Sequence, residues 1–202
     1  MTQARAARTR ESLILAAAAE IDRNGYRGAT VNGICAVAGV SLGALTFHFR
    51  SKLQLALAVS EAGAAAARQC AEGAAARGGA ALASVTALVR AVAGLLEEDV
   101  VVRSAARLER ERPTPVGAWS PSWTAVLRRS LERAEAAGEL RPGAAPQLVT
   151  DLVEYLLTGV ETHPAGPGAS AGSSGLVGRL DRIWPLVERG VAAERGVAAE
   201  RV

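Results

Sequence analysis

Histidine, cysteine and aromatic residues are all scarce in this sequence, and their scarcity removes several classes of function. The 202 residues include two histidines and two cysteines, with no C-x-x-C pair, no nucleophile elbow and no glycine-rich phosphate loop. His163 lies close to Glu161, but one such pair at a helix end is far more typical of a surface than of a catalytic site. We therefore expect no enzymatic activity, no metal ion and no cofactor.

Long apolar runs are also missing. No stretch of 18 apolar residues occurs, so a membrane-spanning helix is not expected. The apolar run Leu13–Ala19 is too short, and too closely followed by charge, for a signal peptide. These absences predict a cytoplasmic protein with no membrane partner. Aromatic residues make up 3% of the chain and hydrophobic residues 50%. The core must therefore be built from Ala, Leu and Val, a composition that favours an all-α fold.

Positive charge is concentrated at the start of the chain. Residues 1–52 hold seven basic and three acidic residues, whereas the remainder holds 16 basic and 17 acidic ones. The whole positive excess thus lies in one short segment, and a local basic face is the electrostatic footprint of phosphate binding. A solvated basic terminus would have the same charge, so the pattern of the segment has to decide.

That segment has the pattern of a helix-turn-helix. A first helix is expected over residues 5–23, and the run T-V-N-G-I-C-A-V-A-G-V-S-L-G-A-L-T-F-H-F-R-S-K then covers Thr30–Lys52. In this run Thr30 and Ser41 are natural N-caps of two short helices. Gly39 supplies the tight turn between them, because a reversal there needs a positive φ. Two helices joined in this way place the second one in the major groove of DNA.

The second helix of the pair, Leu42–His48, is the expected recognition helix. It carries no Arg, Asn or Gln for bidentate contacts to bases, so readout should depend on thymine methyl groups, on Arg50 or an N-terminal arm, and on DNA shape. The residues expected to contact DNA are Thr30, Ser41, Leu42, Gly43, Ala44, Thr46, Phe47, His48, Arg50 and Lys52. Phe47 fits a packed interior equally well, and His48 could instead be a packed histidine at a helix end. Phe49 is expected to be core, and Thr30 also fits a simple helix cap.

Three strings between Gly25 and Leu55 carry a family resemblance: G-Y-R-G-A-T-V, A-G-V-S-L-G-A-L and F-H-F-R-S-K-L-Q-L. Together they resemble the DNA-binding domain of the tetracycline-repressor (TetR) family. The family usually has Tyr, which commonly touches the DNA backbone, where this chain has Thr46, so a shorter hydroxyl has to make that contact if it is made at all. The resemblance implies three N-terminal DNA-binding helices, about six C-terminal helices and a homodimer.

The rest of the chain is expected to form a second helical region. Helices are predicted from Lys52, after a cap at Ser51, to about Arg77, and over residues 82–98, 100–110, 122–137, 146–162 and 176–189, with loops where Pro, Gly and Ser gather. The predicted domains are a helix-turn-helix DNA-binding domain (1–50), a ligand-binding and dimerisation domain (51–190) and a frayed tail (191–202).

Three other strings are similar to the γ-butyrolactone autoregulator receptors of that family: G-A-L-T-F-H-F, the segment Trp119–Trp123 and R-L-D-R-I-W-P-L-V. In such receptors a Trp at the start of the seventh helix lines the pocket, a position that Trp123 matches. Its indole has an apolar face and one N–H donor, which suits a lactone carbonyl. The ligand-binding residues expected are Trp123, Leu88, Val92, Leu127, Tyr155 and Thr158. The alternative is that the tryptophans only fill a core poor in aromatics.

The last two helices, 146–162 and 176–189, are expected to form the dimer interface. The apolar stripe predicted for it consists of Val149, Leu152, Val153, Leu156 and Val160, facing Leu180, Ile183, Leu186 and Val187. A two-fold dimer suits a palindromic operator. The sequence therefore predicts a transcriptional repressor that binds double-stranded DNA and is released by a small apolar effector such as a γ-butyrolactone-type signal. An orphan regulator that responds to an antibiotic, an intermediate or no ligand is the alternative.

Overall fold

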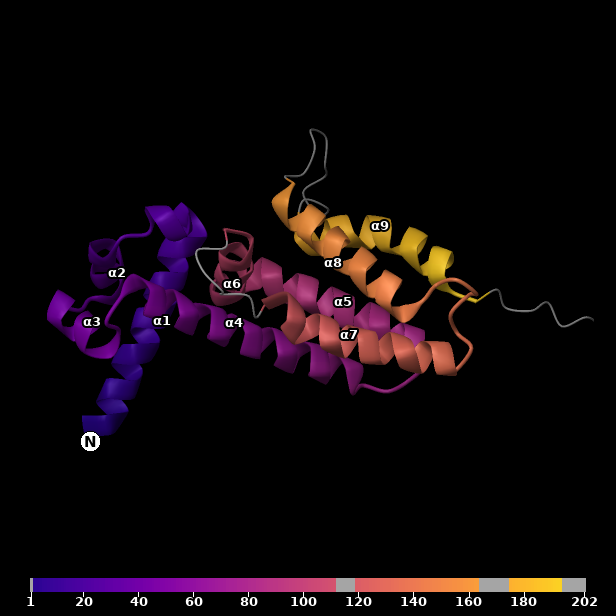
Figure 1. Cartoon of the computed structure of the whole chain (residues 1–202), viewed down its shortest axis with the longest axis horizontal. Helices are drawn as coiled ribbons and strands as arrows, with labels where there is room; N and C mark the ends of the chain where they lie inside the picture. Colours follow the sequence, from indigo (N-terminus) through magenta and orange to yellow (C-terminus); the bar gives the residue numbers. More distant parts are fainter. Residues whose placement is uncertain (1, 112–118, 164–174, 194–202) are drawn as a thin grey trace, which may run out of the picture. The chain divides into compact units, whose positions relative to one another are not determined.

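The computed structural model describes residues 2–111, 119–163 and 175–193, and its regular elements in these ranges are all helices (Figure 1). They are α1 (Thr2–Gly28), α2 (Val31–Ala38), α3 (Leu42–His48), α4 (Lys52–Ala75), α5 (Ala81–Glu98), α6 (Val100–Glu111), α7 (Trp119–Ala136), α8 (Pro146–Thr162) and α9 (Leu176–Val191). The prediction of an all-α fold is confirmed. The predicted frayed tail lies, from residue 194 onward, outside the described residues.

Two helices differ clearly from their predicted bounds. α1 begins at Thr2, three residues earlier than expected. It extends to Gly28, but it consists of two helical stretches that meet at a break at Gly25, where φ is +71°. The break lies close to the end that the sequence predicts for the first helix. α7 begins at Trp119, three residues earlier than expected. The Glu109 carboxylate of α6 accepts a hydrogen bond from the backbone N–H of Ser120 at 3.1 Å, and so satisfies one of the donors that a helix start leaves unpaired.

Contacts within the chain cluster into two units. Unit 1 comprises Met1–Gln69 and Leu95–Trp123, and thus holds α1, α2, α3 and α6 together with most of α4. Unit 2 comprises Cys70–Gly94 and Thr124–Val202, and holds most of α5 and α7 together with α8 and α9. The division predicted at residue 50 is a functional one, and it stays a prediction.

The core of unit 1 holds the two short helices in place. Its fully buried large side chains come from five helices and include Leu13, Ile21, Ile34, Leu45, Leu55 and Leu108. Phe49, which follows α3, is also buried, so its predicted role in the core is confirmed. Each such side chain contributes about 1.5–3 kcal/mol by its burial. Leu45 and Phe49 therefore fix α3 from its inner side and leave its outer side to solvent.

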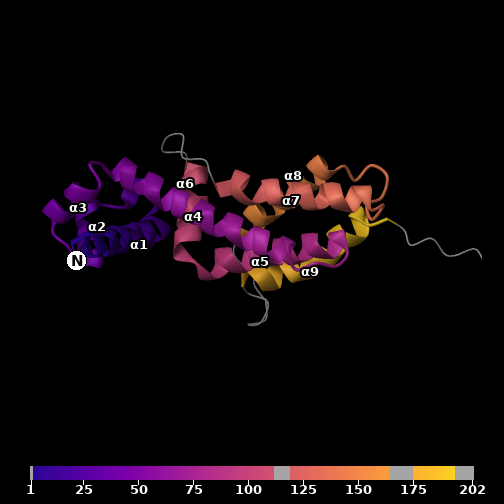
Figure 2. The same ribbon diagram turned by 90° about the horizontal axis from the view of Figure 1, so that it is seen from below.

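In unit 2, α5 lies along α9 (Figure 2), and polar side chains join the two helices. Trp184 of α9 is buried, and its Nε1–H donates to Thr86 Oγ1 of α5 at 3.0 Å. The carboxylate of Glu139 accepts from the first two backbone N–H groups of α5 at 3.1 and 2.7 Å. Glu139 thus caps α5 from a segment that is more than fifty residues away in the sequence.

Two further observations bear on the sequence-based expectations. No single helix in the described ranges is long and apolar enough to cross a membrane, although α2 and α3, taken together as a bent pair, pass that test by length and composition alone. In the same ranges, no three His, Cys, Asp or Glu side chains are grouped so that they could hold a metal ion.

Candidate nucleic-acid interface

Each of the two short helices begins at the cap that the sequence predicts. Thr30 Oγ1 accepts a hydrogen bond from the N–H of Gly33 at 3.0 Å, and Ser41 Oγ accepts from the N–H of Ala44 at 3.2 Å. Both cap residues have extended backbone, as N-caps require. Local hydrogen bonding therefore fixes where α2 and α3 start.

The turn between α2 and α3 is closed by a glycine in the left-handed region. Gly39 has φ +65°, and its N–H donates to Ala36 O at 3.3 Å, while Val40 N–H donates to Cys35 O at 3.1 Å. This pair of bonds is a Schellman motif, which favours glycine at its left-handed position. The two helices are bent by 101°, within the range of a helix-turn-helix.

The outer side of α3 is open to solvent over its whole length. Leu42, Gly43, Thr46 and Phe47 are exposed, and the Phe47 ring is 81% exposed. Phe47 is therefore not a core residue, although its ring meets His48 edge-on with centroids 5.2 Å apart. With Leu42, which is 52% exposed, it gives this side of α3 two large apolar side chains in solvent. The hydroxyl of Thr46 donates back to Gly43 O at 3.1 Å.

The start of α4 is held by a reciprocal cap. Ser51 Oγ accepts from the N–H of Gln54 at 3.1 Å, and Gln54 Oε1 accepts from the N–H of Arg50 at 2.8 Å. This arrangement resembles a capping box, in which two end donors are satisfied at once. The predicted cap at Ser51 is confirmed, and Arg50 is exposed directly after the recognition helix.

Two contacts of this surface were not predicted from the sequence. The guanidinium of Arg10 lies 5.2 Å from the centroid of the Phe49 ring, and Lys52 Nζ lies 4.6 Å from the centroid of the Tyr26 ring. Cation–π contacts of this kind contribute about 0.5–1 kcal/mol at exposed sites. Spacing along the sequence gives no signal for them, because each pair joins residues that are far apart in the chain.

The predicted ligand residues divide into a buried and an exposed set. Trp123, Leu88, Val92 and Leu127 are all buried, and Trp123 is 1% exposed. Tyr155, which is 75% exposed, and Thr158 lie on the open side of α8. The structure therefore does not place these two among the buried residues of the set.

Trp123 has one unusual property. Its Nε1 atom is buried, and no hydrogen-bond partner for it exists among the described residues. Its ring centroid lies 6.3 Å from that of Trp119, and the two rings are tilted by 53°. A buried N–H without a partner costs about 1–3 kcal/mol, so a hydrogen-bond acceptor beside this atom would be favourable.

The apolar stripe predicted for the dimer interface is partly wrong. Val149, Val153 and Val160 of α8 and Leu180 of α9 are buried inside their own chain. The exposed large apolar residues of the two helices are Leu148, Leu152, Tyr155, Ile183 and Leu186. α8 carries two apolar faces, and the spacing of the residues did not show which of them the fold buries.

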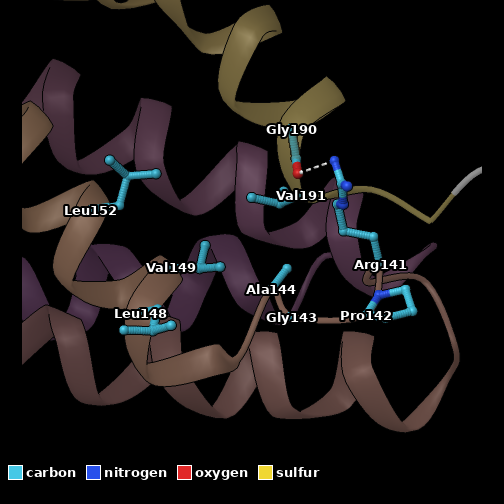
Figure 3. A pocket seen from close by; sticks show the side chains of 9 residues that line it. All are labelled: Arg141, Pro142, Gly143, Ala144, Leu148, Val149, Leu152, Gly190 and Val191. Carbon is cyan, nitrogen blue, oxygen red and sulfur yellow. Dashed lines mark hydrogen bonds between the residues drawn. The ribbon is translucent and has the colours of Figure 1, made fainter.

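Two shallow hollows adjoin this exposed face. The first has a volume of about 350 Å³ and lies where the chain before α8 meets the end of α9. Arg141 lies at one side of it, with Nη1 3.5 Å from Gly190 O (Figure 3). Leu148 and Leu152 form part of its wall. The second, of about 370 Å³, is lined by Tyr155, Ile183 and five neighbours. Neither includes Trp123.

Comparison with known proteins gives a consistent result. Residues 13–59 match the family model described as bacterial regulatory proteins, tetR family. The A-factor receptor protein of Streptomyces griseus is 29% identical over 187 residues, which are 90% of this chain and 63% of that protein. The chain thus covers less than two thirds of the length of this curated relative.

Solved structures extend the similarity over most of the fold. A γ-butyrolactone receptor described as ArpA-like has a TM-score of 0.76 and 27% identity, over 94% of this chain and 91% of that one. TylP, a TetR regulator from Streptomyces fradiae, has a TM-score of 0.72 and 31% identity, over 94% and 89%. These relatives are named as receptors and regulators and not as enzymes, which agrees with the prediction of a non-enzymatic protein. The matched helix-turn-helix and the similarity over the whole fold show that this chain belongs to the TetR family of bacterial regulatory proteins.

Proposed function

We propose that this protein is a cytoplasmic transcriptional repressor that binds a palindromic operator as a homodimer and releases it when a small apolar effector binds. The observation that carries the proposal is the exposed outer side of α3, which a buried inner side and two N-caps hold rigidly. Arg50 and Lys52 flank that side within the segment of positive charge. The arrangement suits a recognition helix in the major groove.

The exposed side chains favour a particular mode of DNA reading. Leu42 and Phe47 are exposed and apolar, so they are suited to contact thymine methyl groups. Gly43 has no side chain, so the backbone of α3 can approach the groove closely at this position. Arg50 supplies an exposed guanidinium two residues after the end of α3, while Thr30, His48 and Lys52 are proposed to bind phosphates. The proposed contact set keeps Ser41, Ala44 and Thr46 as well, where Thr46 would have to turn its hydroxyl away from Gly43 O.

We place the dimer interface on the exposed face of α8 and α9. Leu148, Leu152, Tyr155, Ile183 and Leu186 form an open apolar surface on these helices. Exposed patches of this kind are unfavourable in a monomer and typical of association surfaces. Because the interface of a two-fold dimer is self-complementary, two such faces would pack as a four-helix arrangement.

Footprinting of genomic DNA by the purified protein tests the function and the dimer together. Wild-type protein should protect two half-sites related by a two-fold axis, with binding that falls steeply as salt rises. Leu152→Arg, on an exposed position of α8, should yield a monomer in sedimentation equilibrium and weaken protection at least tenfold, because a monomer binds only half of the phosphates. Protection of one asymmetric site by a wild-type monomer would contradict the proposal.

The proposed effector is an apolar molecule with a carbonyl acceptor, of the γ-butyrolactone type. The Nε1–H of Trp123 is a buried donor with no partner among the described residues, and one of the similar structures is described as a γ-butyrolactone receptor. A carbonyl oxygen that accepts from this N–H would remove the cost of the unpaired donor. Binding would couple to DNA release if the two dimer states differ in affinity for the effector.

Trp123→Phe is expected to raise the Kd for a synthetic acyl-γ-butyrolactone about tenfold, because it removes the N–H donor and keeps an aromatic ring. Operator affinity without effector should stay within about twofold. Titration of the lactone against the protein–operator complex measures both. Trp119→Phe, on the same helix, is the matched control and should behave like the wild type. An unchanged lactone response in Trp123→Phe would contradict the proposed role, and a wild type that no lactone releases would favour the orphan alternative.

A further inference from the structure

The break in α1 is bound by two side chains of α6. In an unbroken helix the N–H of Tyr26 would donate to Asp22 O. Here the N–H of Tyr26 donates to Glu111 Oε2 at 2.6 Å, and Asp22 O accepts from Arg107 Nη1 at 2.7 Å. Arg107 Nε also donates to Glu111 Oε1 at 2.7 Å. The ion pair of Arg107 with Glu111 therefore satisfies both backbone groups at the break. We call Asp22, Gly25, Tyr26, Arg107 and Glu111 the α1–α6 clasp.

Gly25 allows the clasp to form. Its φ of +71° turns the chain away from the helical path, which is a conformation that residues other than glycine adopt at a cost. A Cβ added to it would lie 2.5 Å from Glu111 Oε1 and 2.8 Å from Arg107 Nη2. The carboxylate and the guanidinium thus occupy the space that a side chain would need.

The carboxylate of the clasp is charged at neutral pH. Burial raises the pKa of Glu111, but the hydrogen bonds from the Arg107 side chain and from the N–H of Tyr26, with the charges of Arg107 and Arg110, lower it by more. The net pKa lies below the ordinary value. A charged acceptor binds a backbone N–H about twice as strongly as a neutral one.

The residues just after the break hold Lys52, the first residue of α4. The ammonium of Lys52 lies 4.6 Å from the centroid of the Tyr26 ring and donates to Arg27 O at 3.3 Å. An ammonium has three donors, so Lys52 held in this way keeps donors for a phosphate. A chain of contacts thus leads from α6 through the clasp to a proposed DNA contact.

We propose that Glu111 and Arg107 are positioning residues for DNA binding. They fix the Tyr26–Arg27 segment in the place from which it orients the Lys52 ammonium toward the DNA backbone. The proposal rests on the proposed function, because it concerns a contact made only with DNA. It assigns a role in DNA affinity to a helix that carries none of the predicted DNA-binding residues.

A double-mutant cycle on operator affinity tests the proposal in the full chain. The probe is the duplex that wild-type protein protects in the footprint, and the variants are Glu111→Gln, Lys52→Gln and the two combined. Loss of an acid should tighten DNA binding if only charge matters. We expect the opposite, namely that Glu111→Gln weakens binding about threefold to tenfold. The salt slope, which is the slope of log K against log salt concentration, should decrease in magnitude by about 0.9 for each phosphate that is no longer neutralised.

The combined variant decides whether Glu111 acts through Lys52. In the Lys52→Gln background, Glu111→Gln should change affinity by less than about twofold, since the ammonium that it positions is already absent. Glu98→Gln, which removes an exposed acid of the same unit, is the control and should not weaken binding.

If Glu111→Gln is too unstable for a binding assay, Tyr26→Leu tests the same contact. This variant retains the N–H that Glu111 binds and removes only the ring beneath Lys52, so it should reproduce the reduced salt slope. Unchanged or tighter binding by a folded Glu111→Gln, additive effects in the double variant, or a wild-type salt slope in Tyr26→Leu overturns the inference. A wild-type protein that protects no DNA would instead overturn the proposed function.

Discussion

The Gly43→Glu variant is expected to bind its operator about 100-fold more weakly, or worse, while it keeps its fold. Gly43 is exposed near the start of α3, and a Cβ added there meets nothing closer than Ser41 Oγ, at 3.9 Å. The new side chain therefore leaves the helix and its cap intact. Its carboxylate would lie against the phosphates and acceptor groups of the groove, where like charges cost several kcal/mol. Gel-shift titration at fixed salt measures the change.

Gly73→Glu is the matched control for that experiment. Gly73 lies on α4, is exposed, and has nothing within 4 Å of an added Cβ. The substitution adds the same side chain and the same charge to a helix surface that belongs to unit 2 and not to the unit that holds α3. We expect its operator affinity to stay within about threefold of the wild type. Equal weakening in both variants would show that net charge alone acts, and normal binding by Gly43→Glu would remove α3 from the interface.

Gly63→Ala is expected to lower the free energy of unfolding by about 2 kcal/mol, although alanine is the better helix former. A Cβ at Gly63 of α4 would lie 2.4 Å from the Cβ of Ala105 and 3.0 Å from Val101 O, both on α6. Neither atom is the end of a movable side chain, so the backbones of the two helices would have to separate. For a chain of this size, the effect corresponds to a decrease in Tm of about 4–8 °C.

Gly73→Ala, on the same helix, provides the opposite expectation. No atom lies within 4 Å of its added Cβ, so only helix propensity acts and the free energy of unfolding should rise by about 0.5–1 kcal/mol. Urea unfolding followed by circular dichroism compares the two variants directly. If Gly63→Ala were as stable as Gly73→Ala, the close packing of α4 on α6 would be contradicted.

The sequence by itself determined the helices and the helix-turn-helix, because their signals act over three or four residues. Thr30, Ser41 and Ser51 cap the helices that were expected to start there, and Gly39 takes up its left-handed conformation. Composition and periodicity were also enough for the all-α fold. Each of these features depends on a residue and its near neighbours, which a single sequence displays.

Only the tertiary structure decided what joins distant parts of the chain. The spacing of α8 fits two apolar faces, and packing buried Val149 and Val153 while it left Leu148 and Leu152 exposed. Likewise, no local pattern pairs Tyr26 with Glu111, which is 85 residues away. Hydrogen-bond partners at this separation are chosen by how the helices pack. Since periodicity records which positions are apolar and not which surface covers them, these contacts could not be derived from the sequence.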